Sequence, residues 1–539
     1  MSDNVDARQA KKHKATLLPP EVLQVVATYL QDGKTMHAFV LALPPAWRTE
    51  PMAALATLYE AVCSGQLTNT NMASLWHTLD LRYLTFMPKE LIPIFQAYAP
   101  MLPRLQANLK VHRHLRLPRD TPVTRTRIWS AKELAIALND WAQQLQSLGL
   151  QQDPKKLPIQ LVCEVLPRLL KLRRLDVRWH PDARAEETMS LLNRLIASNV
   201  TELSLHYDVN SAAQWTAREV TALTHWFQAK PVTSIRLVGV PIKVANAETL
   251  ARALLQSQTL KSLSVDGGQL PRTLFSLRLS LPTQLESLHT YVRRSEDVPG
   301  LTDTIAGSNL RTLTVGTLVP LEKDVVLATN FLDAIISLPR LRHLSITHTA
   351  MPLPSVVRLS ERLPALTSLQ LQNTRLDDFG IAVLARALPN CRHLEALKLD
   401  DQECTHWAAE YLASKIPDCP SLKNLDMNFN PIGSRGLRAF LPVVRYLDTL
   451  SLSGCGIDDD GADALCRVID STDHLYKLSL RANRFSTDAM KRIIRAVSTS
   501  STRWGTVYLC DVIEDEEELD RCRRCAKRYL RNESWCIVE

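Results

Sequence analysis

The chain of 539 residues has few glycines, few aromatic side chains and no long apolar run. Glycine occurs only 16 times, and aromatic residues make up 6% of the chain. No stretch approaches the roughly 20 uninterrupted apolar residues that a bilayer-spanning helix needs, so we expect no contact with a membrane. Because the N-terminus lacks an apolar signal core, we expect the protein in the cytoplasm, or in the nucleus as well.

Motifs for chemistry are also scarce. The eleven cysteines are an odd number and are scattered, which indicates reduced thiols of an intracellular protein. The sequence has no phosphate-binding glycine-rich loop, no HExxH and no GxSxG. Cys522 and Cys525 have the spacing of a zinc-ligand pair, but no second pair lies at ligand spacing. We therefore expect no catalytic residue, no metal ligand and no cofactor, and we predict that the chain is not an enzyme.

The charge balance gives little support for nucleic-acid binding. The chain has 64 basic and 56 acidic residues, a mild excess for its length. Residues 104–127 are the exception, with seven lysines or arginines against one acid, Asp120. No Phe, Tyr or Trp stands among these charges, so bases would have no stacking platform. This segment is interpreted as a solvated face or as a contact for an acidic protein, and its role stays open.

Leucine is the abundant residue and is distributed periodically. It occurs 87 times, and the pattern Leu-x-x-Leu-x-Leu, or a close variant, recurs fourteen times at spacings of 25 to 32 residues. A repeat with this period indicates a solenoid. The copies begin at Leu145, Leu172, Val200, Val232, Leu260, Leu285, Leu310, Leu341, Leu366, Leu394, Leu422, Leu447, Leu475 and Trp504.

The second half of many copies has helical periodicity. Ile381, Leu384, Ala385 and Leu388 fall at i, i+3, i+4 and i+7, which makes one face of a helix apolar. A strand followed by such a helix cannot bury both apolar faces alone, so neighbouring units must stack. The sequence therefore predicts an α/β solenoid over residues 141–510, with parallel strands on the concave side and helices outside.

Two further positions are regular in the best copies. We expect the side chain eight residues after the first leucine to hydrogen-bond the turns of adjacent coils, and a glycine at the helix entry to allow close packing. With the segments LDDFGIAVLARAL and NPIGSRGLRAFL, this pattern resembles the ribonuclease-inhibitor class of leucine-rich repeats, which implies a horseshoe. The residues are Asn430, Cys455 and Asn483 at the first position, and Gly380, Gly436 and Gly461 at the second.

The N-terminal segment has a different pattern. Residues 16–50 have an apolar helical face that starts after two prolines. The segment resembles an F-box, the three-helix motif that docks on the small adaptor subunit of cullin-type ubiquitin ligases, although Pro44-Pro45 replaces the usual Val-Cys. The other interpretation is a plain helix pair that caps the solenoid. The resemblance implies adaptor binding through Leu18, Pro19, Glu21, Leu23, Val26, Leu30 and Trp47.

The remaining segments complete the predicted organisation. We expect a disordered tail at 1–15 and a helical insert with degenerate repeats at 51–140. Within the insert, Trp76-His-Thr-Leu79-Asp-Leu81 retains the strand pattern, and His112–Leu117 carries a weaker copy of it. Residues 511–539 place seven acids before six bases, which complements a helix dipole and predicts a capping helix with Leu519 and Tyr529 or Leu530 among its contacts.

This organisation predicts a substrate-recognition adaptor of a cullin-type ubiquitin ligase. The F-box-like segment would bind the adaptor subunit, and the repeats would bind an unidentified target protein. The alternative is a stand-alone leucine-rich-repeat scaffold or sensor. Side chains beside the buried leucines point to the concave face. In the C-terminal half they are Gln370, Gln372, Lys398, Asp400, Asp426, Asn428, Ser451, Ser453, Ser479 and Arg481.

Overall fold

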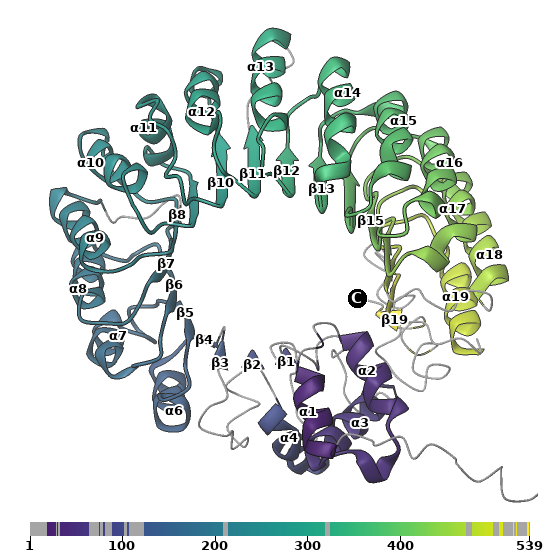
Figure 1. The fold of residues 1–539 in the computed structure, drawn as a ribbon, viewed down its shortest axis with the longest axis horizontal. Coiled ribbons are helices and arrows are strands. Elements are labelled where there is room, and N and C mark those ends of the chain that lie inside the picture. The colour runs from purple at the N-terminus through teal and green to yellow at the C-terminus, as the bar shows by residue number, and fades with distance from the viewer. Residues whose placement is uncertain are drawn as a thin grey trace, which may run out of the picture. The chain divides into compact units, whose positions relative to one another are not determined.

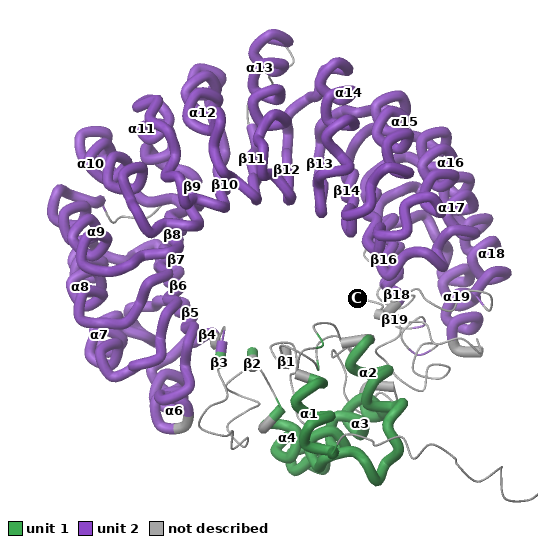
Figure 2. The backbone as a smooth tube through the Cα atoms, in the orientation of Figure 1, with its two compact units in different colours: residues 1–123 green, residues 124–539 purple. Residues whose placement is uncertain are grey.

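The computed structural model divides the chain into two compact units, residues 1–123 and residues 124–539 (Figure 2). The residues that the structure describes are 19–28, 30, 33–63, 75, 79–80, 89–101, 105–106, 123–124, 126–208, 214–317, 324–469, 477–499, 506–509, 521, 524 and 536–537.

The first unit is mainly helical. Met36, Val40, Leu55 and Tyr59 form its core and are at most 1% exposed. A three-stranded sheet has the order β1-β2-β3, and β1 lies at the degenerate copy predicted around Leu79. The fainter copy at 112–117 lies outside the described residues. The elements are α1 (Pro20–Thr28), α2 (Gly33–Ala42), the 3₁₀ turn η1 (Pro45–Trp47), α3 (Glu50–Cys63), β1 (Leu79–Asp80), α4 (Ile92–Tyr98), β2 (Leu105–Gln106) and β3 (Val123–Thr124).

The second unit has a 16-stranded sheet in chain order from β4 to β19. Each of the fourteen predicted copies carries a strand, which begins two residues after the first position of the copy. The sheet extends beyond the predicted limits 141 and 510 at both ends. The strands are β4 (Thr126–Ile128), β5 (Ser147–Gln151), β6 (Arg174–Arg178), β7 (Glu202–His206), β8 (Ser234–Val238), β9 (Ser262–Asp266), β10 (Ser287–Val292), β11 (Thr312–Thr317), β12 (His343–Thr347), β13 (Ser368–Gln372), β14 (Ala396–Asp400), β15 (Asn424–Asp426), β16 (Thr449–Ser451), β17 (Lys477–Ser479), β18 (Thr506–Tyr508) and β19 (Cys536–Ile537).

Helices connect these strands and lie on the outer side of the arc that the second unit forms (Figure 1). A leucine-rich-repeat solenoid is therefore confirmed. The helices are α6 (Ala131–Trp141), α7 (Ile159–Val165), α8 (Ala185–Leu195), α9 (Ala217–Ala229), α10 (Val244–Leu255), α11 (Leu270–Ser276), α12 (Val298–Ile305), α13 (Val325–Ile336), α14 (Leu353–Arg362), α15 (Asp377–Ala387), α16 (His406–Lys415), α17 (Gly433–Phe440), α18 (Asp459–Val468) and α19 (Thr487–Thr499).

The core lies between the strands and the helices. Leu425 and Leu450 are 1% and 0% exposed, so the predicted strand register is correct. A Cβ added at Gly436 would lie 2.6 Å from Ile432 Cβ, and one at Gly461 would lie 2.4 Å from Ile457 Cγ2. Only glycine avoids this overlap, which confirms the predicted close packing at the start of α17 and α18.

Asn430 joins two adjacent coils through backbone groups. Its side-chain oxygen accepts hydrogen bonds from the backbone N–H groups of Gln402 (2.8 Å) and Cys404 (3.4 Å). Its amide nitrogen donates to the carbonyl oxygens of Leu399 (2.8 Å) and Met427 (3.0 Å). The side chain is fully buried, so it satisfies polar groups that water does not reach.

The same position continues this ladder in other coils. Asn483 accepts from the backbone N–H of Cys455 and donates to the carbonyls of Leu452 and Leu480, while the Cys455 thiol donates to the carbonyl of Met427. The predicted role of all three side chains is confirmed. The sequence interpretation missed Gln402, which occupies this position after Leu394 and bonds the carbonyls of Leu371 and Asp400.

The C-terminal end differs from the predicted capping helix. Cys536 and Ile537 form β19, which pairs with Val507 and Tyr508 of β18. This pairing covers the backbone groups that β18 would otherwise expose as an edge strand. Arg521 and Arg524 are helical, and the predicted contacts at 519, 529 and 530 lie outside the described residues, as does the predicted tail at 1–15.

Candidate functional site

The concave face of the repeat unit is a regular array of side chains. The strands pair in parallel with equivalent positions of successive copies side by side. One row across the sheet is therefore Gln370, Lys398, Asp426, Ser451 and Ser479. All ten predicted partner-binding residues lie on strands β13 to β17 or within two residues after them. The sheet therefore brings together residues that are far apart in the sequence.

Asn428 is the centre of a polar network on this face. Its amide nitrogen donates to carboxylate oxygens of Asp400 (2.9 Å) and Asp426 (2.7 Å). Its side-chain oxygen accepts from the hydroxyl of Ser451 (2.8 Å) and the backbone N–H of Ser453 (2.8 Å). Five of the predicted residues thus bond one another across β14, β15 and β16, which reduces the polar groups they can offer to a partner.

Asp400 has an altered proton affinity within this network. Burial, followed by the nearby Asp426 carboxylate, raises the pKa of Asp400 to about 6 from its ordinary value of 3.8. Lys398 Nζ lies 4.0 Å from Asp426 Oδ2, and its side chain is 41% exposed. A carboxyl group that titrates near neutral pH makes the charge of this region depend on pH.

Arg481, the last of the ten predicted residues, stacks near an aromatic ring that the sequence interpretation missed. Its guanidinium carbon lies 4.8 Å from the centre of the Tyr508 ring, and Lys477 Nζ lies 5.1 Å from the same ring. Ser479 pairs with Tyr508 in the sheet register. Continuing the row of concave positions into the degenerate last copy would have found this tyrosine.

The predicted adaptor-binding residues do not share one environment. Pro19 and Glu21 are exposed and Trp47 is half-buried, whereas Leu18 lies outside the described residues. Leu23 is only 9% exposed, because it shares the inward face of α1 with Ala27. Leu23 was expected both to pack internally and to present apolar surface to the adaptor, and its position agrees with the packing but leaves little surface for the adaptor.

Three valines give α1 an exposed apolar surface, and one of them, Val26, is a predicted adaptor-binding residue. Val22, Val25 and Val26 are 40%, 56% and 41% exposed, and their i, i+3, i+4 spacing places them on one face of the helix. We call these three residues the α1 patch. Leu30, the remaining predicted residue, is half-buried. Thr49 Oγ1 donates to Gln24 Oε1 (2.5 Å), which ties α1 to the segment before α3.

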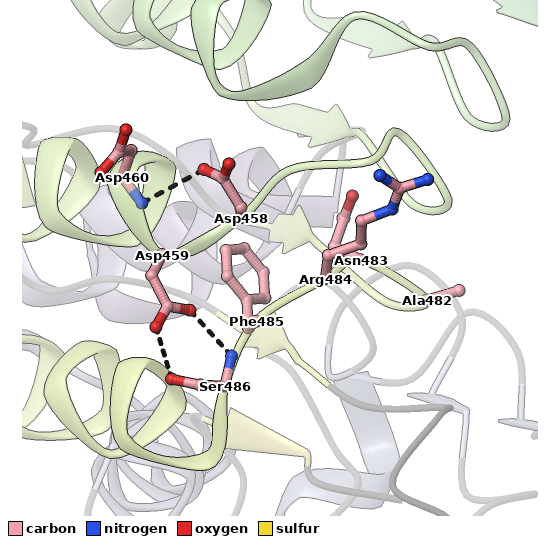
Figure 3. A pocket seen from close by; sticks show the side chains of 8 residues that line it. All are labelled: Asp458, Asp459, Asp460, Ala482, Asn483, Arg484, Phe485 and Ser486. Carbon is pink, nitrogen blue, oxygen red and sulfur yellow. Dashed lines mark hydrogen bonds between the residues drawn. The ribbon is translucent and has the colours of Figure 1, made fainter.

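A pocket of about 690 Å³ lies between the start of α18 and the loop after β17 (Figure 3). Asp459 accepts hydrogen bonds from the backbone N–H and the hydroxyl of Ser486, at 2.8 and 2.5 Å. Asp458 accepts from the backbone N–H of Asp460 (3.2 Å) and the hydroxyl of Ser434 (2.5 Å). Asp458 caps α18, and Asp459 bonds the residue that precedes α19, so both carboxylates are used by the fold.

Other kinds of site are absent from the described part of the chain. No cluster of three or more His, Cys, Asp or Glu residues there could hold a metal ion. Among the same residues, no helix is both long and apolar enough to span a bilayer. The candidate sites are thus two surfaces, the concave face and the α1 patch.

Comparison with known proteins supports the repeat assignment. A family model described as "Leucine Rich repeat" matches residues 418–441 and 445–466. The ribonuclease inhibitor of Sus scrofa is 31% identical over 168 residues, which are 30% of this chain and 36% of that protein. NACHT, LRR and PYD domains-containing protein 5 of Homo sapiens is 31% identical over 150 residues, which are 27% of this chain and 12% of that protein.

These matches cover limited parts of each protein. The alignments span 36% and 43% of the length of the ribonuclease inhibitors of Sus scrofa and Mus musculus. A solved chain from a complex of Rad7 and Elc1 in yeast aligns with 87% of this chain and 90% of its own length, with 14% identity and a TM-score of 0.42. That similarity is too low to carry a functional conclusion.

Fold, repeat sequence and relatives agree on the class of protein. The chain carries leucine-rich repeats that are similar to those of ribonuclease inhibitors. Its strand face presents many side chains that the core does not need, and the repeat unit is a protein-interaction scaffold.

Proposed function

We propose that the protein is a substrate-recognition adaptor of a cullin-type ubiquitin ligase. The helical segment at 19–50 docks on the small adaptor subunit, and the repeat unit holds a target protein. Other subunits carry out catalysis, so the chain itself is not an enzyme and uses no cofactor. The complex acts in the cytoplasm, or in the nucleus as well.

The α1 patch is the observation that carries this proposal. Exposed valines on one face of a short helix are typical of a surface that another protein covers. They lie within the segment whose sequence resembles an F-box, next to the exposed Pro19 and Glu21. A plain capping helix pair would instead bury its apolar residues within its own unit.

A binding experiment with the full chain tests the proposal. The double variant Val25→Gln and Val26→Gln replaces two half-exposed apolar side chains with polar ones that retain good helix propensity. Burying a valine stabilises a complex by about 1.5 kcal/mol or more, so losing two should weaken adaptor binding about hundredfold. The measurement is the Kd for the purified adaptor subunit.

The repeat unit offers a matched control. Val325 and Val326 at the start of α13 are 57% and 70% exposed, so Val325→Gln and Val326→Gln make the same chemical change far along the chain. Adaptor binding should remain unchanged in this control. No binding by the intact chain, or equal loss in both double variants, would reject the adaptor proposal and leave the stand-alone scaffold as the function.

A further inference from the structure

Three arginines stand on alternate strands at the N-terminal end of the concave face. Arg127 lies on β4, Arg178 on β6 and Arg236 on β8. All three side chains are exposed. The sheet register places Arg127 and Arg236 in one row, with Asp176 of β6 between them, and places Arg178 two residues further along β6. Neighbouring strands lie about 4.8 Å apart and residues are about 3.3 Å apart along a strand, so successive arginines are separated by about 12 Å. We call these three residues the arginine ladder.

The ladder differs from Arg174 and Arg293 of the same region because it has no acidic partner among the described residues. Arg174 pairs with Glu202, and Arg293 Nη2 lies 3.3 Å from Asp266 Oδ1. Within the described residues, no carboxylate forms an ion pair with any member of the ladder. These guanidinium groups can therefore accept a carboxylate from outside the chain.

Two histidines near the arginines, one on β7 between β6 and β8 and one on β10, report the local positive charge. His206 pairs in register with Arg178. Burial lowers the pKa of His206 most, and the nearby Asp176 carboxylate raises it. The three arginines of the ladder lower it further. Burial and Arg236 likewise lower the pKa of His289 on β10. The field of the ladder thus extends over several strands and favours an anion.

We propose that the arginine ladder binds an extended acidic segment of the target protein. In an extended chain, side chains three to four residues apart are separated by about 10 to 13 Å, a range that includes the separation of successive arginines. Each arginine would meet a glutamate or aspartate, while the residues between them cross the neighbouring strands. This inference deepens the proposed function, because it names the chemical class of the target.

A protein segment fits this surface better than a nucleic acid does. Asp176 is on β6, which lies between β4 and β8. Its carboxylate oxygen Oδ2 is 3.8 Å from His206 Nε2. A continuous phosphate backbone would be repelled by this carboxylate. A peptide avoids the repulsion, because it can place a neutral residue there.

The test uses the full chain and a synthetic peptide with a glutamate at every third position. The matching peptide with glutamines instead measures binding that does not depend on charge. The triple variant Arg127→Glu, Arg178→Glu and Arg236→Glu should weaken binding of the acidic peptide at least about tenfold, because three exposed pairs become repulsive. Wild-type binding should also weaken as salt rises.

A control variant changes the net charge by the same amount on other exposed arginines. Arg168, Arg218 and Arg386 belong to η5 (Leu166–Arg168), α9 and α15, and their reversal to glutamate should leave peptide binding unchanged. Equal loss in this control, or no loss in the ladder variant, would overturn the inference. Tighter binding of single-stranded RNA through the same arginines would overturn the class of partner. Since no adaptor subunit is present, the outcome is independent of the adaptor proposal.

Discussion

The substitution Asn430→Ala tests how the repeat unit holds its coils together. It removes a fully buried side chain that bonds the backbone of two neighbouring coils and leaves the strand leucines in place. The backbone N–H groups of Gln402 and Cys404 and the carbonyls of Leu399 and Met427 would lose this partner.

The expected cost follows from these bonds. Leaving a buried polar group without a partner costs about 1 to 3 kcal/mol, but water can enter the space of the deleted amide and replace some bonds. We therefore expect the free energy of unfolding to fall by about 3 to 5 kcal/mol. Asn430→Cys should cost less, because a thiol can donate as Cys455 does to Met427 (3.2 Å) in the next coil.

Two measurements check this prediction. Urea unfolding gives the loss of stability for each variant, provided that the slope with denaturant is unchanged. Hydrogen exchange at the amides of Gln402 and Cys404 should accelerate in Asn430→Ala more than at amides of distant coils, because the effect is local. A loss below about 1 kcal/mol, or exchange that is unchanged at both amides, would refute the role assigned to the asparagine.

Two more predictions concern the strands. Leu425→Ala should lower the free energy of unfolding by about 2 to 5 kcal/mol in urea unfolding, because Leu425 is 1% exposed and its removal leaves a cavity; a loss below 1 kcal/mol would contradict the packing. Asp400→Asn should raise the free energy of unfolding by about 1 to 2 kcal/mol at pH 7 to 8. The pKa of Asp400 is about 6 in the folded protein and 3.8 ordinarily, so the ionised carboxylate is less stable in the folded state than in the unfolded state. The gain should shrink as the pH falls below 6 and vanish at about pH 3 and below, where Asp400 is protonated in both states, and a gain independent of pH would contradict this cause.

The repeat could be predicted from sequence because each strand depends on residues close together in the chain. Two leucines two residues apart determine which side chains of a strand enter the core. Leu369 and Leu371 are both 0% exposed, as the pattern requires. The two ends of the sheet were harder to predict, because β4 and β19 are short strands that lack the full leucine pattern.

The candidate surfaces were only partly predictable, since they depend on contacts between distant residues. The apolar periodicity of α1 marks Val22, Leu23 and Val26 alike, but only packing decides that Leu23 is buried and the two valines are exposed. Likewise, Arg178 and Arg236 lie in different copies, and nothing local indicates that they share a face with Arg127. The basic segment at 104–127 was interpreted as a solvated face or a contact for an acidic protein, and it contains only one member of the ladder, Arg127.

The two halves of the concave face differ in what they can offer a partner. In the C-terminal half, Asn428 engages Asp400, Asp426 and Ser451, so a partner that binds there must compete with existing hydrogen bonds. In the N-terminal half, the arginine ladder is exposed and has no carboxylate partner among the described residues. Binding to an exposed charge replaces only water, whereas binding within a satisfied network also breaks internal bonds. For an acidic target, the favourable electrostatic free energy of binding is therefore available mainly at the N-terminal half.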